Sequence, residues 1–333
     1  MGLKVGRSGL IGAAMLALSA GCAAAAGPAP GYAVEPFLVA GTFEPGRGPD
    51  GNSVFLDAPD GLILIDSGRH PEHQARLLDH AREAAKPIVA IVNTHWHLDH
   101  SGGNAEIGAA YPDAPLYASR AIDGALAGFF PASRAAAERY LAAGGVSPEQ
   151  EAEIRRDFAA MDDPQALRPD QPVTASGPMA IAGRPLLVNL AEHAATEGDV
   201  WIYDPATRTV VAGDLVVAMV PFMDTACPEG WRRALGEIAA LPFETLIPGH
   251  GAPMSRQQFA AWRAAFNGLL ACASSAKGKD ECVAGWRRDA AAFIPAGEEA
   301  RADEMVSYYI DTRLRAAPAE RERYCRPSPP ARN

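Results

Sequence analysis

The sequence predicts an α/β protein in which a buried strand ends in a metal-binding loop. Short apolar runs alternate with amphipathic segments through the middle of the chain, and 48% of its 333 residues are hydrophobic, enough for a large packed core. The apolar run 88–93 leads directly into the loop Thr94–His100, which reads THWHLDH. This loop places three imidazoles and a carboxylate side by side, which is an unusual composition for a surface turn.

The spacing of these side chains predicts two adjacent ligand sets. A strand that ends in a tight loop directs His95 and His97 to one point and Asp99 and His100 to another close by. Imidazole nitrogens and carboxylate oxygens together suit two neighbouring zinc ions. The alternative, a polar surface turn, is disfavoured because five of the eight histidines fall in candidate ligand positions.

The other elements follow from apolar periodicity and from glycine and proline breaks. A turn at Asp60-Gly61 separates the first two strands. His70, His73 and His80 are expected to be solvated residues of the first helix, with an approach of His70 to the mouth of the site as the alternative. Strands are predicted at 53–57, 62–66, 88–93, 116–118, 186–190, 200–203, 209–212 and 245–247. Helices are predicted at 71–85, 103–110, 229–240, 255–273 and 299–314.

Residues 120–170 are predicted to form a helical insertion with helices at 121–130, 133–143 and 147–161. Pro131 and Gly144-Gly145 are expected to break the helices, and Ser147 with Gln150 resembles a capping box. Phe129 and Phe130 are interpreted as core residues, with a position at the mouth of the site as the alternative. Phe222 and Met223 are candidate substrate-binding residues because binding residues gather in loops after strand ends; packing beneath the next helix is the alternative.

Four motifs in order resemble the metallo-β-lactamase superfamily between residues 51 and 254. They are H-x-H-x-D-H at 95–100 and the segments 62–68, 211–215 and 247–251. The resemblance implies a four-layer αβ/βα metallo-β-lactamase sandwich. Residues 120–170 would be an insertion in it, and residues 255–333 a C-terminal helical extension.

The resemblance also implies the ligands of two Zn²⁺ ions. One ion would be held by His95, His97 and a third histidine, the other by Asp99, His100 and His250, and Asp214 would bridge them. Such a pair lowers the pKa of a shared water from about 15.7 towards ~7, so that hydroxide is available to attack a carbonyl. Asp99 is the expected catalytic residue, since it both ligates and orients the water. Iron is the less favoured metal.

One motif departs from the family. The pattern H-T-x-G-D is matched at Thr196–Asp199, but Ala195 stands where the histidine belongs and His193 lies two residues earlier. We expect a rearranged turn that brings His193 to the first metal, because three protein ligands are usual for catalytic zinc. In the alternative that metal loses a ligand, and a one-metal centre on Asp99, His100 and His250 results.

The N-terminus and the cysteines predict export. Residues 1–26 resemble a secretory signal peptide, with Lys4 and Arg7 before an apolar run and small residues. A lipid anchor at Cys22 is an alternative, and no transmembrane span is expected after signal removal. Residues 27–50 are expected to form a surface segment. In an oxidising periplasmic or secreted location the remaining cysteines should form disulfides, with Cys272–Cys282 and Cys227–Cys325 the expected pairs.

These features predict an exported dizinc hydrolase acting on a small-molecule ester, thioester, lactone or related carbonyl compound. The net charge of −10 argues against a nucleic-acid partner. The aspartate at 214 resembles thioesterases and lactonases, and the segment 212–250 resembles zinc metallohydrolases associated with quinoprotein systems. A β-lactamase is the second hypothesis, favoured by export. A metal-binding protein without turnover is the third, and Ala195 is its support.

Overall fold

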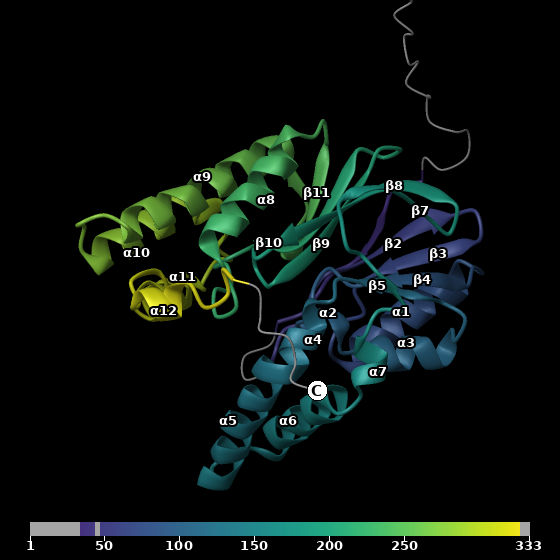
Figure 1. Cartoon of the computed structure of the whole chain (residues 1–333), viewed down its shortest axis with the longest axis horizontal. Coiled ribbons are helices and arrows are strands. Elements are labelled where there is room, and N and C mark those ends of the chain that lie inside the picture. The colour runs from purple at the N-terminus through teal and green to yellow at the C-terminus, as the bar shows by residue number, and fades with distance from the viewer. Residues whose placement is uncertain (1–33, 44–46, 327–333) are drawn as a thin grey trace, which may run out of the picture.

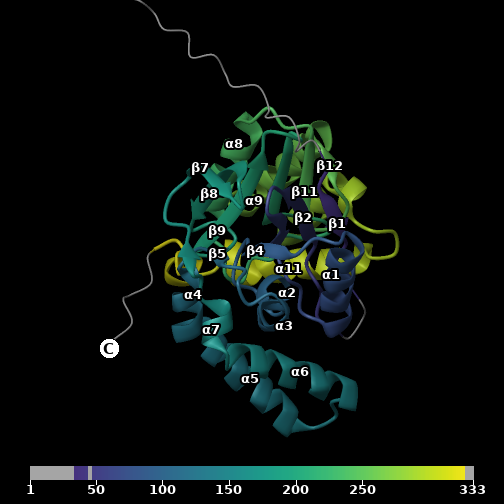
Figure 2. The same cartoon turned by 90° about the vertical axis from the view of Figure 1, so that its right-hand side faces the viewer.

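The computed structural model describes residues 34–43 and 47–326 and shows two facing β-sheets with helices on both outer sides (Figures 1 and 2). The four-layer sandwich expected from the sequence is confirmed. The signal segment 1–26 and Cys22 lie outside the described residues. Within the described part of the chain, no helix is both long and apolar enough to cross a bilayer.

The first sheet has the strand order β1-β2-β3-β4-β5-β6, and the second has the order β12-β11-β10-β9-β8-β7. The first contains β1 (Phe37–Val39), β2 (Ser53–Ala58), β3 (Gly61–Ile65), β4 (Ile88–Val92), β5 (Leu116–Ala118) and β6 (Gln171–Pro172). The second contains β7 (Gly177–Ile181), β8 (Arg184–Glu192), β9 (Gly198–Asp204), β10 (Thr209–Val217), β11 (Thr245–His250) and β12 (Met254–Ser255).

The helices cover the sheets and form the insertion and the C-terminal extension (Figure 1). In chain order the first are α1 (Pro71–Glu83), α2 (Leu98–Ser101), α3 (Asn104–Ala110), α4 (Ala121–Gly124), η1 (Ala125–Phe129), α5 (Phe130–Ala143), α6 (Pro148–Met161) and α7 (Pro164–Leu167). They are followed by α8 (Pro228–Ala240), α9 (Arg256–Ala273), α10 (Lys279–Asp289), η2 (Ala291–Phe293), α11 (Glu299–Tyr309), η3 (Ile310–Leu314) and α12 (Pro318–Arg321).

Three apolar interfaces hold the layers together. Branched aliphatic residues such as Ile63 and Ile202 pack between the sheets. Leu77 of α1 packs on the outer face of the first sheet. On the second sheet, buried Trp231 and Trp262 donate indole hydrogen bonds of 2.9 Å to backbone carbonyls of β10, so the polar part of each ring is satisfied.

The segment 27–50 was expected to lie on the surface, and its described part also joins the first sheet. Its described part contains β1, which pairs antiparallel with β2, and Phe37 stacks on His80 with ring centroids 3.8 Å apart. This strand has only three residues, and it lies in a segment rich in proline and glycine, so the sequence does not mark it as a strand. The sequence analysis likewise missed β7 and α10.

The insertion also differs from expectation at its first proline. α4, η1 and α5 run on without a break, although Pro131 is the second residue of α5 and has no backbone N–H to donate. The single π-helical turn η1 precedes it and offsets the helix by one residue. The second predicted break is present, with Gly144 in the left-handed region, and the capping box of Ser147 and Gln150 is confirmed.

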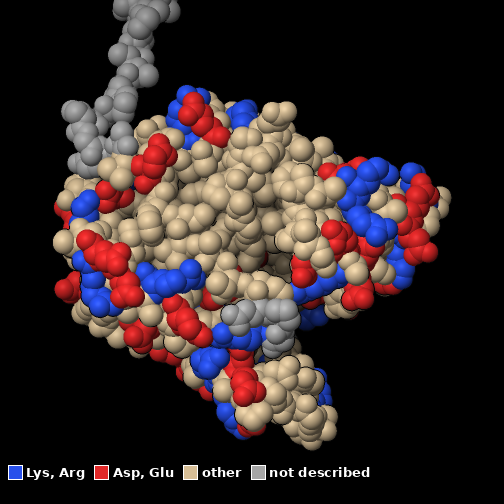
Figure 3. Space-filling view, turned by 180° about the vertical axis from the view of Figure 1, so that it is seen from behind, with Lys and Arg blue, Asp and Glu red and all other residues tan. Residues whose placement is uncertain are grey.

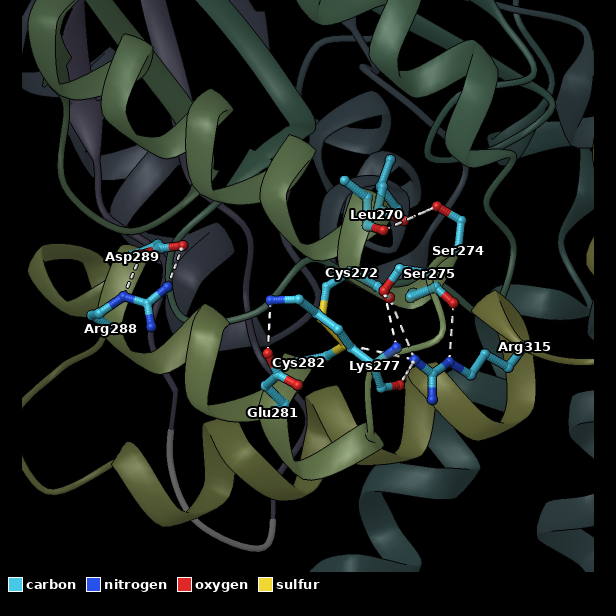
Figure 4. The surroundings of a disulfide bond; sticks show 12 residues. Leu270, Cys272, Ser274, Ser275, Lys277, Glu281, Cys282, Arg288, Asp289 and Arg315 are labelled. Atoms are coloured by element: carbon cyan, nitrogen blue, oxygen red, sulfur yellow. Dashed lines mark hydrogen bonds and ion pairs between the residues drawn. A yellow bond between two sulfur atoms is a disulfide. The ribbon is translucent and has the colours of Figure 1, made fainter.

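Both expected disulfides are present. Cys227 is bonded to Cys325, and Cys272 is bonded to Cys282 (Figure 4). Beside the second bond, Arg315 donates hydrogen bonds to the carbonyls of Ala273 and Lys277, which fixes the turn between α9 and α10. The first bond ties the C-terminal tail to the start of α8.

Charged residues are distributed around the molecule without a broad basic face in the view from behind. Figure 3 shows Lys and Arg interspersed with Asp and Glu around the margin of that face, while its middle is mostly uncharged. The net charge of the whole chain is −10.

His70 and His73 are buried, contrary to the expectation of solvated histidines, with 4% and 1% exposure. His70 lies between two carboxylates: its Nδ1 is 2.8 Å from Asp50 Oδ2, and its Nε2 contacts Glu153 of α6. Burial lowers the pKa of His70, but the two carboxylates raise it above the usual value. This contact therefore ties the helical insertion to the core.

We expect His70 to make stability depend on pH. A histidine whose folded pKa is raised stabilises fully below its unfolded pKa of about 6.5, and the contribution is lost as pH rises through the folded pKa. The free energy of unfolding in urea should therefore differ more between wild type and His70→Asn at about pH 5 than at about pH 9. An equal difference at both pH values would show that the charged form has no special part in docking the insertion.

Candidate metal centre

Six candidate ligands predicted from the sequence come together at one end of the two sheets. His95 and His97 follow β4, and Asp99 and His100 lie in the short helix α2. Asp214 lies within β10, and His250 ends β11. Their ligand atoms fall into two clusters: a first cluster of His95, His97 and Asp214, and a second cluster of Asp99, His100, Asp214 and His250.

Asp214 belongs to both clusters and turns one oxygen to each. Its Oδ2 lies 3.7 Å from His95 Nε2, and its Oδ1 lies 3.1 Å from His100 Nε2 and 3.5 Å from His250 Nε2. In the second cluster, Asp99 Oδ2 is 3.0 Å from His250 Nε2. This division of one carboxylate between two sets of imidazoles is the arrangement of a bridging ligand.

The close approach of these segments depends on glycine at two positions. A Cβ atom on Gly51 would lie 2.2 Å from the ring of His100, and one on Gly249 would lie 2.1 Å from Asp214 Oδ1. Asn52 joins the two halves here, since its side chain donates 2.8 Å hydrogen bonds to the carbonyls of Pro248 and Gly251. The two sheets are thereby held together at the centre.

Asp66 orients the imidazoles from behind. It follows β3 with a φ of 62°, a left-handed conformation that is costly for a residue with a side chain. Its carboxylate accepts hydrogen bonds from Thr94 N at 2.7 Å and Thr94 Oγ1 at 2.8 Å, and from His100 Nδ1 at 2.8 Å. The Nδ1 proton of His100 is thus directed to Asp66, which leaves Nε2 to face the cluster.

The donor set fits divalent metal ions. His95 Nε2 and His97 Nδ1 lie 2.9 Å apart, and His100 Nε2 and His250 Nε2 lie 3.2 Å apart. Asp214 Oδ1 is buried and receives no hydrogen bond in proper geometry. Buried polar atoms are almost always satisfied, so converging nitrogens beside an orphaned carboxylate oxygen indicate a place for cations.

The protonation of the two clusters differs. Burial lowers the pKa of His95 well below its usual value and that of His97 to about 4, so both are neutral ligands at pH 7. Burial opposes the charged form of His100 as well, but Asp214, Asp66 and Asp99 raise its pKa well above the usual value. A cation that binds the second cluster therefore displaces protons, as metal binding to histidine sites generally does.

His193 does not complete the first cluster. Its Nδ1 lies 3.0 Å from the carbonyl oxygen of Tyr324, and its backbone has a φ of 53°. The carbonyl of His193 is packed so tightly against α8 that a Cβ on Gly230 would lie 1.6 Å from it. The turn therefore directs the ring to the C-terminal tail, which the disulfide of Cys227 holds in place.

The rest of that turn is ordered as the motif predicts. Asp199 accepts hydrogen bonds from Thr196 N at 2.9 Å and Thr196 Oγ1 at 3.1 Å. Ala195 is 2% exposed and brings only its methyl group and backbone to this region. The T-x-G-D part of the motif is thus retained as structure, while its histidine has no counterpart among the two clusters.

Aromatic side chains surround His97 of the first cluster. Phe222 meets the ring of His97 edge-on at 5.1 Å between centroids, and half-buried Phe129 lies 6.2 Å from it on another side. Trp96 packs between Phe129 and the buried Phe130. Phe222 and Phe129 therefore lie beside His97, whereas Phe130 is buried in the core.

Met223 is placed differently from expectation. It is 1% exposed and packs in the core beneath α8 and the C-terminal helices. The side chains of this loop alternate in direction, so Phe222 faces the site and its neighbour faces inward.

Sequence reasoning also missed Asp66, Thr94 and Thr225 as residues that contact the candidate ligands. The one available signal was Asp66 itself, an aspartate at the end of a buried strand.

The family model of the metallo-beta-lactamase superfamily matches residues 46–250. The chain belongs to this superfamily.

Two relatives and one solved structure illustrate its range. The alpha subunit of 2,4-dinitroanisole O-demethylase from a Nocardioides strain is 26% identical over 259 residues, covering 75% of this chain and 69% of the relative. A linear primary-alkylsulfatase from a Pseudomonas strain is 24% identical over 226 residues, covering 61% of this chain but only 42% of the relative. The sec-alkyl sulfatase PisA1, a double mutant, shares 16% identity with a TM-score of 0.51, covering 78% of this chain and 47% of that one.

Proposed function

We propose that this protein is an exported, zinc-dependent hydrolase that opens an ester, thioester, lactone or related carbonyl bond in a small molecule. The observation that carries the proposal is Asp214, whose two oxygens are divided between two sets of histidines. Membership of a superfamily of metallohydrolases supports the class of reaction. The two disulfides support an oxidising location outside the cytoplasm.

The proposed ligands follow the two clusters. His95, His97 and Asp214 would hold one ion, and Asp99, His100, Asp214 and His250 would hold the other. Zinc ions bound there would supply a water of lowered pKa and an electrophile for the oxygen of the scissile group. His193 is left out of this set because its ring lies against the tail.

The chain's own residues contribute the positioning and the proton handling. The pKa of Asp99 lies well below its usual value; burial opposes this, but the charges of His100 and His250 outweigh it. Asp99 is therefore ionised at neutral pH, and its carboxylate would accept a hydrogen bond from a water at the metal pair and orient it. Phe222 and Phe129 exclude bulk water from the side of His97 and offer apolar surface to the substrate.

A sulfate ester is the second candidate substrate. One sequence relative and one structural relative are named as alkylsulfatases. The aromatic wall beside His97 would suit an alkyl chain as well as it suits the apolar part of a carboxylic ester. Because this chain spans less than half of each of those proteins, a sulfatase activity would have to be completed by its own insertion and C-terminal helices.

A substrate screen on protein of measured metal content tests the proposal. The panel contains generic esters, thioesters, lactones, alkyl sulfates and a chromogenic cephalosporin. We expect turnover of a carbonyl substrate by the zinc-loaded protein and its loss after chelation. A protein that carries two zinc ions yet hydrolyses no ester, thioester or lactone would contradict the proposal, and hydrolysis of the cephalosporin or the sulfates alone would select the corresponding alternative.

A further inference from the structure

Thr225 lies between the altered turn at Ala195 and the first cluster, where a third histidine would be expected. It belongs to the loop that joins β10 to α8 and is fully buried. Its Oγ1 is 3.0 Å from the carbonyl oxygen of Ala195 and 3.1 Å from His97 Nε2. One hydroxyl thus connects the residue that replaces the histidine with a ligand of the first cluster.

The direction of these two hydrogen bonds fixes the tautomer of His97. A threonine hydroxyl has a single proton, and the carbonyl of Ala195 has none, so Thr225 donates to Ala195. Toward His97 the hydroxyl can then only accept. His97 Nε2 therefore carries the ring proton, and Nδ1 is left with a free lone pair that faces His95 Nε2 at 2.9 Å.

The tautomer of His95 is fixed in the same way, by a threonine hydroxyl that donates its proton elsewhere. Thr94 Oγ1 donates to Asp66 Oδ2 at 2.8 Å, so it accepts from His95 Nδ1 at 3.0 Å. This leaves the lone pair of His95 Nε2 directed at His97. Two bare nitrogen lone pairs at this separation repel each other, and a cation between them relieves the repulsion.

The loop that carries Thr225 is held firmly enough to position a ligand. Its residue Cys227 donates a backbone hydrogen bond of 2.8 Å to Ala194 and is disulfide-bonded to the tail. Arg313 of the C-terminal helices donates to the carbonyl of Met223 at 3.0 Å. The hydroxyl is therefore anchored from the turn, from the tail and from the helical extension.

We propose that Thr225 is a positioning residue of the first metal site, which compensates in part for the absent third histidine by presenting His97 Nδ1 to the ion. This inference rests on the proposed function only in that a metal binds the first cluster. A site built from His95, His97 and Asp214 alone has only three protein ligands. Its affinity for the ion therefore depends strongly on how well each ring is oriented. Loss of an outer hydrogen-bond partner of a metal-ligating histidine lowers affinity by about 10- to 100-fold.

Thr225→Val and Thr225→Ser form a matched pair for the test. Valine keeps the shape and removes the hydroxyl, whereas serine keeps the hydroxyl. Zinc titration against a chromophoric chelator should show that Thr225→Val weakens the weaker binding step by about 10- to 100-fold and leaves the stronger step unchanged, while Thr225→Ser binds as wild type does. Unchanged affinity for both ions in Thr225→Val would overturn the proposal.

Nitrogen-15 NMR of the imidazoles in metal-free wild-type protein gives a second readout. We expect His97 as the Nε2–H tautomer, with its assignment made by the loss of that signal in His97→Gln. A His97 found as the Nδ1–H tautomer would also overturn the proposal, even if Thr225→Val failed to fold. Neither measurement uses turnover, so a protein with no activity in the substrate screen would leave this result standing.

Discussion

Replacing both His95 and His97 by alanine is expected to reduce hydrolysis to below about 1% of the wild-type rate. The two rings are the least ambiguous candidate ligands of the first cluster, and without them a metal ion would no longer be held there to lower the pKa of a bound water. Neither ring contributes to the apolar interfaces between the layers, so the protein should remain folded and exported. Turnover is measured on the best substrate of the screen, with zinc content determined on the same sample.

His80→Ala is the matched control for that variant. This histidine stacks on Phe37 far from the two clusters and should leave both turnover and metal content unchanged. Circular dichroism and the unfolding temperature establish that the double variant is folded. A folded double variant with more than a few per cent of wild-type activity would remove the first cluster from the mechanism.

Asp214→Asn is expected to weaken the pair of ions more than either ion alone. The carboxylate supplies negative charge between two dications a few ångströms apart, and a neutral amide cannot offset their repulsion. The affinity for the second ion bound should fall by at least about 100-fold, the upper end of the range for outer hydrogen-bond partners, because Asp214 is itself a ligand. Metal stoichiometry by elemental analysis and a zinc titration measure the effect.

Asp123→Asn provides the comparison, since this aspartate pairs with Arg168 on the surface of the insertion. It should bind two ions with wild-type affinity. If Asp214→Asn retained two ions per chain and the wild-type rate, the bridge would have to be withdrawn, and the two clusters would be independent sites.

Local patterns were sufficient for the ligands that lie next to a buried strand. The apolar run of β4 fixes where the chain emerges, and the loop that follows has too few residues to place His95 and His100 anywhere but at the strand end. Asp214 and His250 could be assigned because the segments 211–215 and 247–251 resemble motifs of the superfamily. The disulfide pairs could be predicted because few cysteines are available and one pair encloses a short polar turn.

The same reasoning failed where the direction of a side chain depends on a distant segment. His193 has the right residue type after the right strand, but its turn is pressed against Gly230 of α8 and its ring is bound by Tyr324 of the tail. Met223 and Phe222 are equally apolar, and only the packing of the C-terminal helices decides which of them is buried. His70 reads as a solvated residue at the start of a helix, yet Glu153, some eighty residues later, encloses it.

The sequence by itself determined the fold, the superfamily and the six residues that the two clusters bring together, because the motifs that carry the family resemblance are short segments. The tertiary structure alone decided what surrounds the first cluster. Thr225 lies thirty residues from Ala195 and belongs to no recognisable motif, so its hydrogen bonds to the carbonyl of Ala195 and to His97 exist only once the two sheets, α8 and the tail have packed together. A hydrogen bond between residues so far apart in the chain leaves no local pattern, because it depends on where the packed core holds each backbone.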